Sequence, residues 1–393
     1  PGLFIAVYLS IYIAPFPMLS AIDWWDNLWH PIIRAAGRAL GLTVATQPTG
    51  SGDTSYHWAE LAVDVVLALA ATAALWIARP RWLGAGAREA IRIYVRFFLA
   101  TVACGYGLLK LFPLQMPVPG PDRLLGTIGD TSPMGLLWTL MGASPAYQMI
   151  TGAVEVLAGL LLLFRRTVHV GALLCAFAMA QVVALNLCFD VPVKLFSSHL
   201  LGMCIYLLWP VLPRLVGYLA LGLPAAPLPV APLVLPGRWL PWGRAIAKTL
   251  AVAAYLGSAI LSSRQELVKR AEKDRDPWRG LWAVEQYEPA GVPAEERWQR
   301  VGISSSYPRL GIRRTDGHVD RYSWTRDEKT RELTLSFGSQ KLIYRYAEPA
   351  PGQLRLEQRD GGNVTVLLRK LPKAESLLLT RGFHWINEFP YNR

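Results

Sequence analysis

A short link between two apolar runs reads Leu185-Asn-Leu-Cys-Phe-Asp-Val-Pro-Val-Lys-Leu-Phe-Ser-Ser-His199, and each run is long enough to cross a bilayer. Within fourteen positions the link carries one amide and three ionisable side chains, Asn186, Asp190, Lys194 and His199. Ionisable groups at the edge of hydrocarbon are costly unless they are paired or hydrated. The stretch therefore predicts a helical membrane protein with a functional site where these two spans meet.

The composition extends this pattern over most of the chain. Of the 393 residues, 52% are hydrophobic and 17% are charged, whereas a soluble domain is about 25% charged. The apolar excess ends near residue 263, which predicts a transmembrane domain over 1–263 and a soluble domain over 264–393. Seven transmembrane helices are expected, at 3–20, 57–78, 93–112, 147–164, 168–186, 197–217 and 246–263.

The remaining segments have patterns of their own. Residues 22–43 are aromatic and amphipathic, which indicates a helix lying in the membrane interface. Residues 223–245 hold six prolines and predict an extended linker. From Trp278 onward, short alternating runs separated by turns predict an antiparallel all-β domain, either a small barrel or a sandwich.

Lysine and arginine gather in alternate loops, around 79–92, 165–166 and 214–248. The positive-inside rule assigns those loops to the cytoplasm. With seven spans the N-terminus is then cytoplasmic and the C-terminal domain extracytoplasmic, which in a bacterial inner membrane means the periplasm. The chain begins at Pro1 without a Met, so the true N-terminus stays open.

In this orientation, polar side chains gather at the outer ends of the spans. Tyr106 and Lys110 lie four apart on one helical face, and so do Glu60 and Asp64. Around an outward-facing pocket with an apolar wall, such groups would bind a lipid-soluble ligand and move its protons. The expected catalytic residues are Lys110, Glu155, Asp190, Lys194 and His199, and the expected ligand-binding residues are Tyr106, Gln115, Asn186, Asp64 and His57.

Most of these residues also have a purely structural explanation. Lysine at the end of a span can extend to the headgroups, and Asp190-Val-Pro can simply be a turn. Glu155 can pair with Lys110 or Lys194 to fix helix packing. Asp64 is harder to explain in this way, because a carboxylate at that depth needs a partner or water. Both interpretations stay open on the sequence alone.

Other classes of protein and site are less compatible with the sequence. The net charge of +12 is spread over loops and tail among acidic residues, whereas nucleic-acid binding favours a clustered patch. We therefore expect membrane lipids, and no nucleic acid, as partners. The four cysteines lie in or beside apolar runs without a Cys-x-x-Cys motif, which is typical of small buried hydrophobes and not of a metal site.

Several motifs together carry a family resemblance. They are Tyr106-Gly-Leu-Leu-Lys110, Gly129-Asp-Thr-Ser-Pro-Met-Gly-Leu-Leu-Trp138, Glu155-Val-Leu-Ala-Gly-Leu-Leu-Leu-Leu-Phe-Arg-Arg-Thr167 and the link from Asn186 to His199. Over about residues 50–215 the chain resembles the DoxX-like membrane proteins, and 381–393 looks like the end of their longer, tail-bearing members. The resemblance implies a four-helix core to which further helices have been added.

What the resemblance implies about function is broad. The DoxX-like group includes a subunit linked to thiosulfate oxidation by quinone and a protein needed for maturation of a periplasmic amine dehydrogenase. The resemblance therefore implies quinone-linked or other extracytoplasmic redox chemistry, with a quinone as the candidate ligand. The alternative is a non-catalytic accessory or assembly subunit whose β domain docks a protein partner in a membrane complex. Whether the chain is an enzyme stays open. The pocket hypothesis requires six residues to converge around a cavity that a lipid tail can reach: Lys110, Glu155, Asn186, Asp190, Lys194 and His199.

Overall fold

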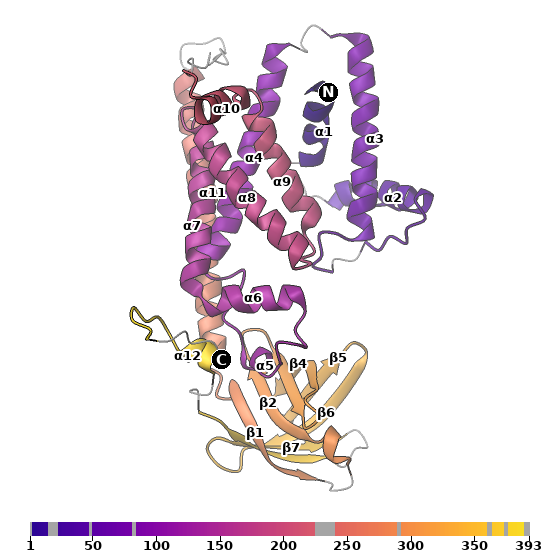
Figure 1. The fold of residues 1–393 in the computed structure, drawn as a ribbon. Coiled ribbons are helices and arrows are strands. Elements are labelled where there is room, and N and C mark those ends of the chain that lie inside the picture. The colour runs from indigo at the N-terminus through magenta and orange to yellow at the C-terminus, as the bar shows by residue number, and fades with distance from the viewer. Residues whose placement is uncertain are drawn as a thin grey trace. The chain divides into compact units, whose positions relative to one another are not determined.

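The computed structural model describes residues 2–14, 23–46, 49–80, 84–224, 240–288, 292–359, 364–372 and 376–388. The chain divides into two compact units (Figure 1). The helical unit comprises Pro1–Gln115 and Met149–Leu261, and the barrel unit comprises Met116–Gln148 and Ser262–Arg393. The sequence placed 116–148 in the transmembrane domain, whereas the structure groups this segment with the β domain.

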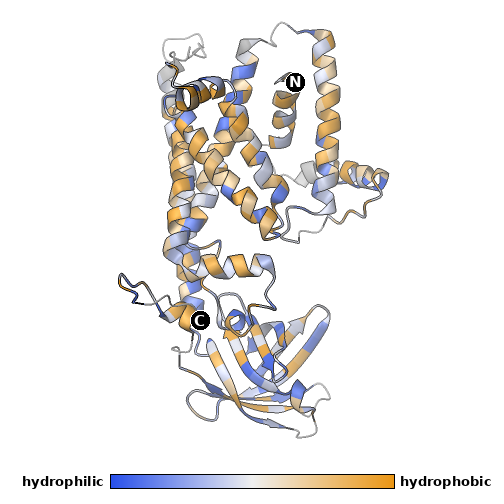
Figure 2. Ribbon diagram, viewed as in Figure 1, coloured by the Kyte–Doolittle hydropathy of each residue, from blue (hydrophilic) through white to orange (hydrophobic). Residues whose placement is uncertain are grey.

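The helices of the helical unit are rich in apolar residues, which appear orange in Figure 2 between white intermediate and blue polar positions. Within the described ranges, five helices are long and apolar enough to cross a membrane, or six if the bent pair α9–α10 is one span. This confirms a multi-pass helical membrane region. All described helices of this unit, spanning or not, are α1 (Gly2–Ile13), α2 (Asp23–Ala39), α3 (Ser55–Ala78), α4 (Ala85–Leu111), α7 (Pro145–Leu162), α8 (Val168–Cys188), α9 (Lys194–Leu208), α10 (Leu212–Leu221) and α11 (Leu240–Lys273).

Two predicted spans differ from the observed helices. The span predicted at 197–217 is broken, because α9 and α10 meet at an angle of 81°. Pro210 and Pro213 stand at the break, where proline removes helical hydrogen bonds and restricts the residue before it. The span predicted at 3–20 contains the 12-residue helix α1, about 18 Å long at 1.5 Å per residue and shorter than the bilayer core. Residues 15–20 lie outside the described part.

For other predicted segments the structure changes the boundaries but not the type of element. The interfacial helix predicted at 22–43 corresponds to α2, which is interrupted by no break despite Pro31 inside it. Most of the predicted linker 223–245 lies outside the described residues, but α11 already begins at Leu240. This helix is 34 residues long, so it continues past the membrane-spanning length into the barrel unit.

Small residues set the distance between α4 and α7. A Cβ atom on Gly152 would lie 2.6 Å from the carbonyl oxygen of Gly107, and one on Gly159 would lie 2.9 Å from that of Ala100. Both neighbours are backbone atoms, so no side-chain rearrangement can make room. Close approach through glycine is a common way for helices to associate in membranes, where no hydrophobic driving force separates protein from lipid.

The barrel unit contains a closed barrel of eight antiparallel strands in sequence order. The strands are β1 (Gly280–Glu288), β2 (Trp298–Ser304), β3 (Arg309–Arg314), β4 (Val319–Asp327), β5 (Glu332–Phe337), β6 (Gln340–Ala347), β7 (Gln353–Gln358) and β8 (Thr365–Lys370). Alternate side chains such as Val301, Ile303 and Leu335 are 0% exposed and fill the interior. This confirms the predicted antiparallel β domain and selects the barrel over the sandwich.

The segment between α4 and α7 lies against the outer face of this barrel. It contains α5 (Pro121–Leu124) and α6 (Pro133–Ala143). Gly302 and Gly311 are directly paired on β2 and β3, and a Cβ on Gly302 would lie 2.4 Å from the carbonyl oxygen of Pro121. Ser304 also donates a hydrogen bond to Asp122. The paired glycines therefore leave the space in which α5 sits, which explains why this segment belongs with the barrel.

Candidate functional site

The helical unit contains a cavity of about 250 Å³ at the N-terminal ends of α3 and α9. Residues from four helices and from the loops before α3 and α9 line it. Its polar lining consists of Tyr12, His57, Glu60, Asp64, Tyr106 and His199, and its remaining lining consists of Gly52, Leu61, Val193, Leu195 and Phe196. The cavity thus combines two carboxylates, two imidazoles and two phenols with an aliphatic and aromatic wall.

Helix α3 supplies the acidic side of the cavity. His57, Glu60 and Asp64 follow one another at spacings of three and four, so they share one helical face. The indole nitrogen of Trp29 donates to Glu60 Oε1 at 3.1 Å. Asp64 is 5% exposed and has no hydrogen bond or ion pair with a side chain in the part of the chain that the structure describes. Two carboxylates that form no ion pair within the described ranges favour a ligand that brings protons or hydrogen-bond donors.

The start of α3 is closed by its own capping residues. Thr54 is the N-cap, and its backbone N–H donates to His57 Nδ1 at 3.3 Å. Thr54 Oγ1 also lies 2.8 Å from the same ring nitrogen. This is the reciprocal arrangement of a capping box, with histidine in the position usually taken by Glu or Gln. His57 is therefore oriented by the helix end at which the cavity begins.

His199 on α9 is held in one tautomer by two contacts. Its Nδ1 lies 2.7 Å from the carbonyl oxygen of Leu195, and because a carbonyl can only accept, Nδ1 carries the hydrogen. The hydroxyl of Tyr8 lies 2.5 Å from Nε2, so it donates to that nitrogen when the ring is neutral. Tyr12 stacks on the imidazole, with ring centroids 3.9 Å apart and planes 7° apart. Helix α1 thus orients the histidine through two tyrosines one turn apart.

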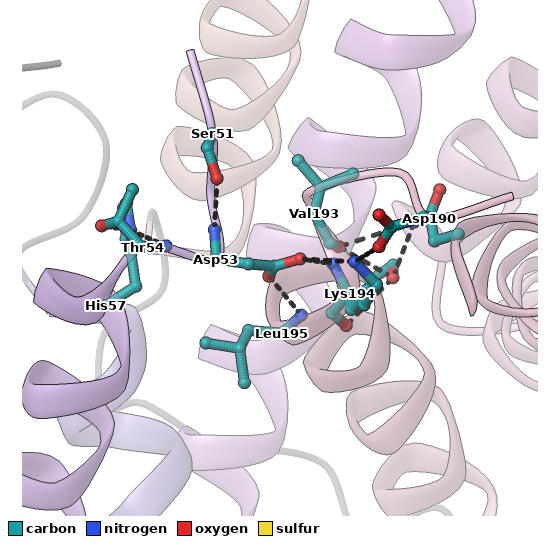
Figure 3. A network of polar contacts seen from close by, with 10 residues as sticks. Ser51, Asp53, Thr54, His57, Asp190, Val193, Lys194 and Leu195 are labelled. Atoms are coloured by element: carbon teal, nitrogen blue, oxygen red, sulfur yellow. Dashed lines mark hydrogen bonds and ion pairs between the residues drawn. The ribbon is translucent and has the colours of Figure 1, made fainter. Parts of the chain in front are cut away.

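A polar cluster at the rim of the cavity fixes the start of α9 (Figure 3). Helix α9 has no side-chain cap of its own. Instead, the Asp53 carboxylate from the loop before α3 accepts hydrogen bonds from the backbone N–H groups of Lys194 at 2.8 Å and Leu195 at 2.9 Å. Lys194 Nζ lies 2.7 Å from Asp190 and 3.8 Å from Asp53. Asp53 therefore caps a helix far away in sequence, with the favourable sign for the helix dipole.

This arrangement predicts a clear loss of stability for Asp53→Ala. Two backbone N–H groups of α9 lose their partner, so we expect the free energy of unfolding to fall by about 1–2 kcal/mol, the usual cost of losing a helix cap. Equilibrium unfolding in mixed detergent micelles measures it. Asp190→Asn is the control, because the Asp190 side chain is 82% exposed and asparagine tolerates its positive φ of 50°. Equal losses in both variants would contradict the capping role.

The predicted site residues separate into groups. His57, Asp64, Tyr106 and His199 line the cavity. Asp190 and Lys194 lie at its rim in the ion pair just described, with Asp190 in the left-handed turn that ends α8. The pocket hypothesis required six residues to converge on one cavity: Lys110, Glu155, Asn186, Asp190, Lys194 and His199. Of these six, His199 alone lines this cavity.

The other predicted residues have neighbours away from the cavity. Lys110 and Glu155 form an ion pair between α4 and α7, with side chains 8% and 4% exposed. Asn186 donates to Ser197 Oγ at 2.9 Å and so joins α8 to α9. The Oε1 atom of Gln115 is buried without a hydrogen-bond partner in the described structure. For Lys110, Glu155 and Asn186, these contacts favour the structural explanation.

Sequence reasoning did not select Tyr8, Tyr12, Glu60 or Asp53 as site residues. Glu60 had a usable signal, because it shares a helical face with Asp64. The two tyrosines also lie four apart, but nothing in the sequence indicates that α1 packs against α3 and α4. Among the described residues, no group of three or more His, Cys, Asp or Glu side chains could hold a metal ion.

Comparison with known proteins finds a relative whose function is not described. The chain is 32% identical over 131 residues to the uncharacterized protein YwoB of Bacillus subtilis (strain 168), a match that covers 31% of this chain and 77% of that protein. No protein-family model matches the chain. No solved structure matches it either.

Proposed function

The chain belongs to the family of the uncharacterized protein YwoB of Bacillus subtilis (strain 168), and we propose that it is a membrane protein whose cavity binds a lipid-soluble molecule of the quinone class. The single observation that carries this proposal is the composition of the cavity. Protonatable groups and hydrogen-bonding phenols stand beside an aromatic and aliphatic wall, at the ends of apolar helices.

The dimensions of the cavity are compatible with one substituted ring. A cavity of about 150 Å³ lined by apolar side chains holds benzene, and the volume here is about 250 Å³. Tyr12, Tyr106 and Phe196 offer aromatic faces on which a flat ring can stack. The oxygens of such a ring need donors or acceptors, which His57 and the two phenols supply.

The chemistry proposed for these residues is proton exchange with the bound ring. Reduction of a quinone to a quinol takes up two electrons and two protons, and oxidation releases them. Glu60, Asp64 and His199 are the groups that would hold or accept those protons, with Tyr8 behind His199 as a relay. The electrons would pass to or from a redox partner. The resemblance to DoxX-like proteins agrees with this class of ligand.

The membrane and its sides are part of the same proposal. In sequence, Arg79 and Arg81 follow α3, and Arg88 and Arg92 lie in the first turns of α4. The loop after α7 carries Arg165 and Arg166. The positive-inside rule assigns these loops to the cytoplasm. In a bacterial inner membrane the opposite ends of α3 and α9, where the cavity begins, would then face the periplasm.

A second function is supported by the other polar residues. The pair Lys110–Glu155 joins two helices, and the Asp53–Lys194–Asp190 cluster fixes the start of α9. A non-catalytic accessory subunit would also require such contacts. In that case the cavity is a packing feature, and the barrel unit docks a protein partner.

Purification in mild detergent followed by mass spectrometry of the bound lipids tests the first proposal. We expect a stoichiometric quinone with the unmodified chain and at least about a tenfold loss in Asp64→Asn and His199→Gln, because a hydrogen bond to a charged group contributes roughly 1.5–3 kcal/mol. Asp190→Asn is the matched control, since it alters a polar group at the rim without touching the cavity lining, and it should retain the quinone.

The outcome that would sink the quinone proposal is equally specific. If no quinone or other isoprenoid accompanies the unmodified chain, or if all three variants retain it equally, the cavity is not its binding site. A stable set of partner proteins without any small molecule would then support the accessory subunit.

A further inference from the structure

Arginine side chains gather where α5 lies against the barrel. Leu310 and Ile312 on β3 are 1% exposed and fill the barrel interior. Successive residues of a strand face opposite sides, so Arg309 and Gly311 face outward. Arg321 on β4 is the direct register partner of Gly311. Arg123 comes from α5. All of these residues belong to the barrel unit, and we call Arg123, Arg309 and Arg321 the arginine cluster.

The positive charge of the arginine cluster is not balanced by nearby acids. None of its three residues forms an ion pair with any residue in the described ranges. The Nε atom of Arg321 is buried and lacks a hydrogen-bond partner there, as does that of neighbouring Arg313. Asp122 is close, but its carboxylate accepts the hydrogen bond from Ser304. Burial lowers the pKa of Arg123, and the charges of Arg321 and Arg309 lower it further while Asp122 opposes them.

Two guanidinium groups are held against backbone and not extended into solvent. A Cβ on Gly126 would lie 3.0 Å from a terminal nitrogen of Arg321, and one on Gly135 would lie 2.6 Å from a terminal nitrogen of Arg123. Gly135 is in the first turn of the 11-residue helix α6, whose N-cap is Ser132. Arg123 therefore adds its charge to the end of a helix that is already partially positive.

The arginine cluster differs from ordinary surface arginines in its hydrogen bonding and in the separation of its charges. An exposed arginine keeps all five donors in water, but here a donor is buried unsatisfied. Like charges normally separate, whereas Arg321 and Arg309 both lie within electrostatic reach of Arg123. A bound oxyanion would balance the charge and accept hydrogen bonds from the terminal guanidinium nitrogens, and arginine is the side chain best suited to hold one in this way.

We infer that the arginine cluster binds a phosphate-class oxyanion, either free phosphate or the phosphate of a phospholipid headgroup. The site is distinct from the cavity of the helical unit and does not depend on the quinone proposal. Arg321 and Arg123 are the principal ligands, through the terminal nitrogens of their guanidinium groups.

The test for free phosphate uses the full chain in a neutral detergent and phosphate-free buffer. Sodium phosphate is titrated at constant ionic strength while the unfolding temperature is measured. We expect the unfolding temperature of the unmodified chain to rise and then saturate. The control Arg345→Gln, which removes one exposed arginine from β6, should behave in the same way. The rise should be lost in Arg321→Gln and reduced in Arg123→Gln.

The test for a headgroup uses native mass spectrometry of the same four proteins with added phosphatidylglycerol or phosphatidylcholine. Retention of either phospholipid by the unmodified chain and Arg345→Gln, with at least a fivefold loss in Arg321→Gln, identifies a lipid phosphate. A response to inorganic phosphate alone identifies the free anion. Each result supports the site and distinguishes its two sources.

The unfolding temperatures measured without phosphate show whether the variants fold. Without phosphate, Arg321→Gln should unfold at or above the temperature of the unmodified chain, because one repulsive charge has been removed. The inference is overturned if neither probe binds to the unmodified chain, or if all four proteins respond equally to both probes.

Discussion

Replacing Lys110 by methionine will lower the free energy of unfolding by about 3–5 kcal/mol, the usual cost of breaking a buried ion pair from one side. The Lys110 and Glu155 side chains are 8% and 4% exposed, so the carboxylate left behind has little access to water. Its Oε2 atom already lacks a hydrogen-bond partner among the described residues. The remaining charge would therefore stay buried and uncompensated.

The double variant Lys110→Met with Glu155→Leu separates this cause from a general packing defect. Once both charges are removed, we expect most of the lost stability to return, since buried ion pairs are often replaceable by apolar residues of similar volume. Equilibrium unfolding in mixed detergent micelles gives all the values of this double-mutant cycle. If Lys110→Met costs no more than an exposed lysine substitution, or if the double variant is no better than the single one, the ion pair does not stabilise the fold.

Gly152→Leu is the second substitution with a large expected effect. The new side chain would meet the carbonyl oxygen of Gly107 at 2.6 Å and the backbone nitrogen of Leu111 at 2.7 Å. Because these are backbone atoms, α4 and α7 must separate. We expect a loss of roughly 3 kcal/mol or more, at the upper end for overpacking. Lys110 Cβ lies 2.8 Å from the same point, so the separation should also weaken the Lys110–Glu155 pair.

Gly202→Ala on α9 is the matched control for this prediction. Nothing lies within 4 Å of the Cβ that it would add, and alanine favours a helix interior over glycine by roughly 0.5–1 kcal/mol. The control should therefore unfold at the same denaturant concentration as the unmodified chain or a higher one. Similar behaviour of Gly152→Leu and Gly202→Ala would show that α4 and α7 do not approach through glycine.

The cavity and the buried ion pair have consequences for experiments on function. Lys110 and Glu155, both expected from the sequence to be catalytic, lie in a contact that holds two helices together. Substituting either would lower activity simply through unfolding. Variants of Asp64 and His199 are more informative because these side chains line the cavity, and their effects should be read against a stability measurement on the same protein.

The class of the fold follows from local patterns along the chain. Hydropathy is a property of single residues summed over a window, so apolar runs and the change near residue 263 are visible without any knowledge of contacts. The same holds for the alternating runs of the C-terminal domain, which form the barrel strands. Polar residues at span ends were also visible, and four of the ten chosen from them line the cavity.

Contacts between distant segments are a different kind of information. Hydropathy does not state which helices are neighbours or how each is rotated about its axis, so the Tyr8–His199 contact could not be foreseen. Asp53 looks like a cap for the helix that follows it, but it caps α9 because the loop before α3 passes that helix end. The segment 116–148 joins the barrel because paired glycines leave room for it. Such packing depends on the shapes of surfaces far apart in sequence, which appear only when the chain is folded.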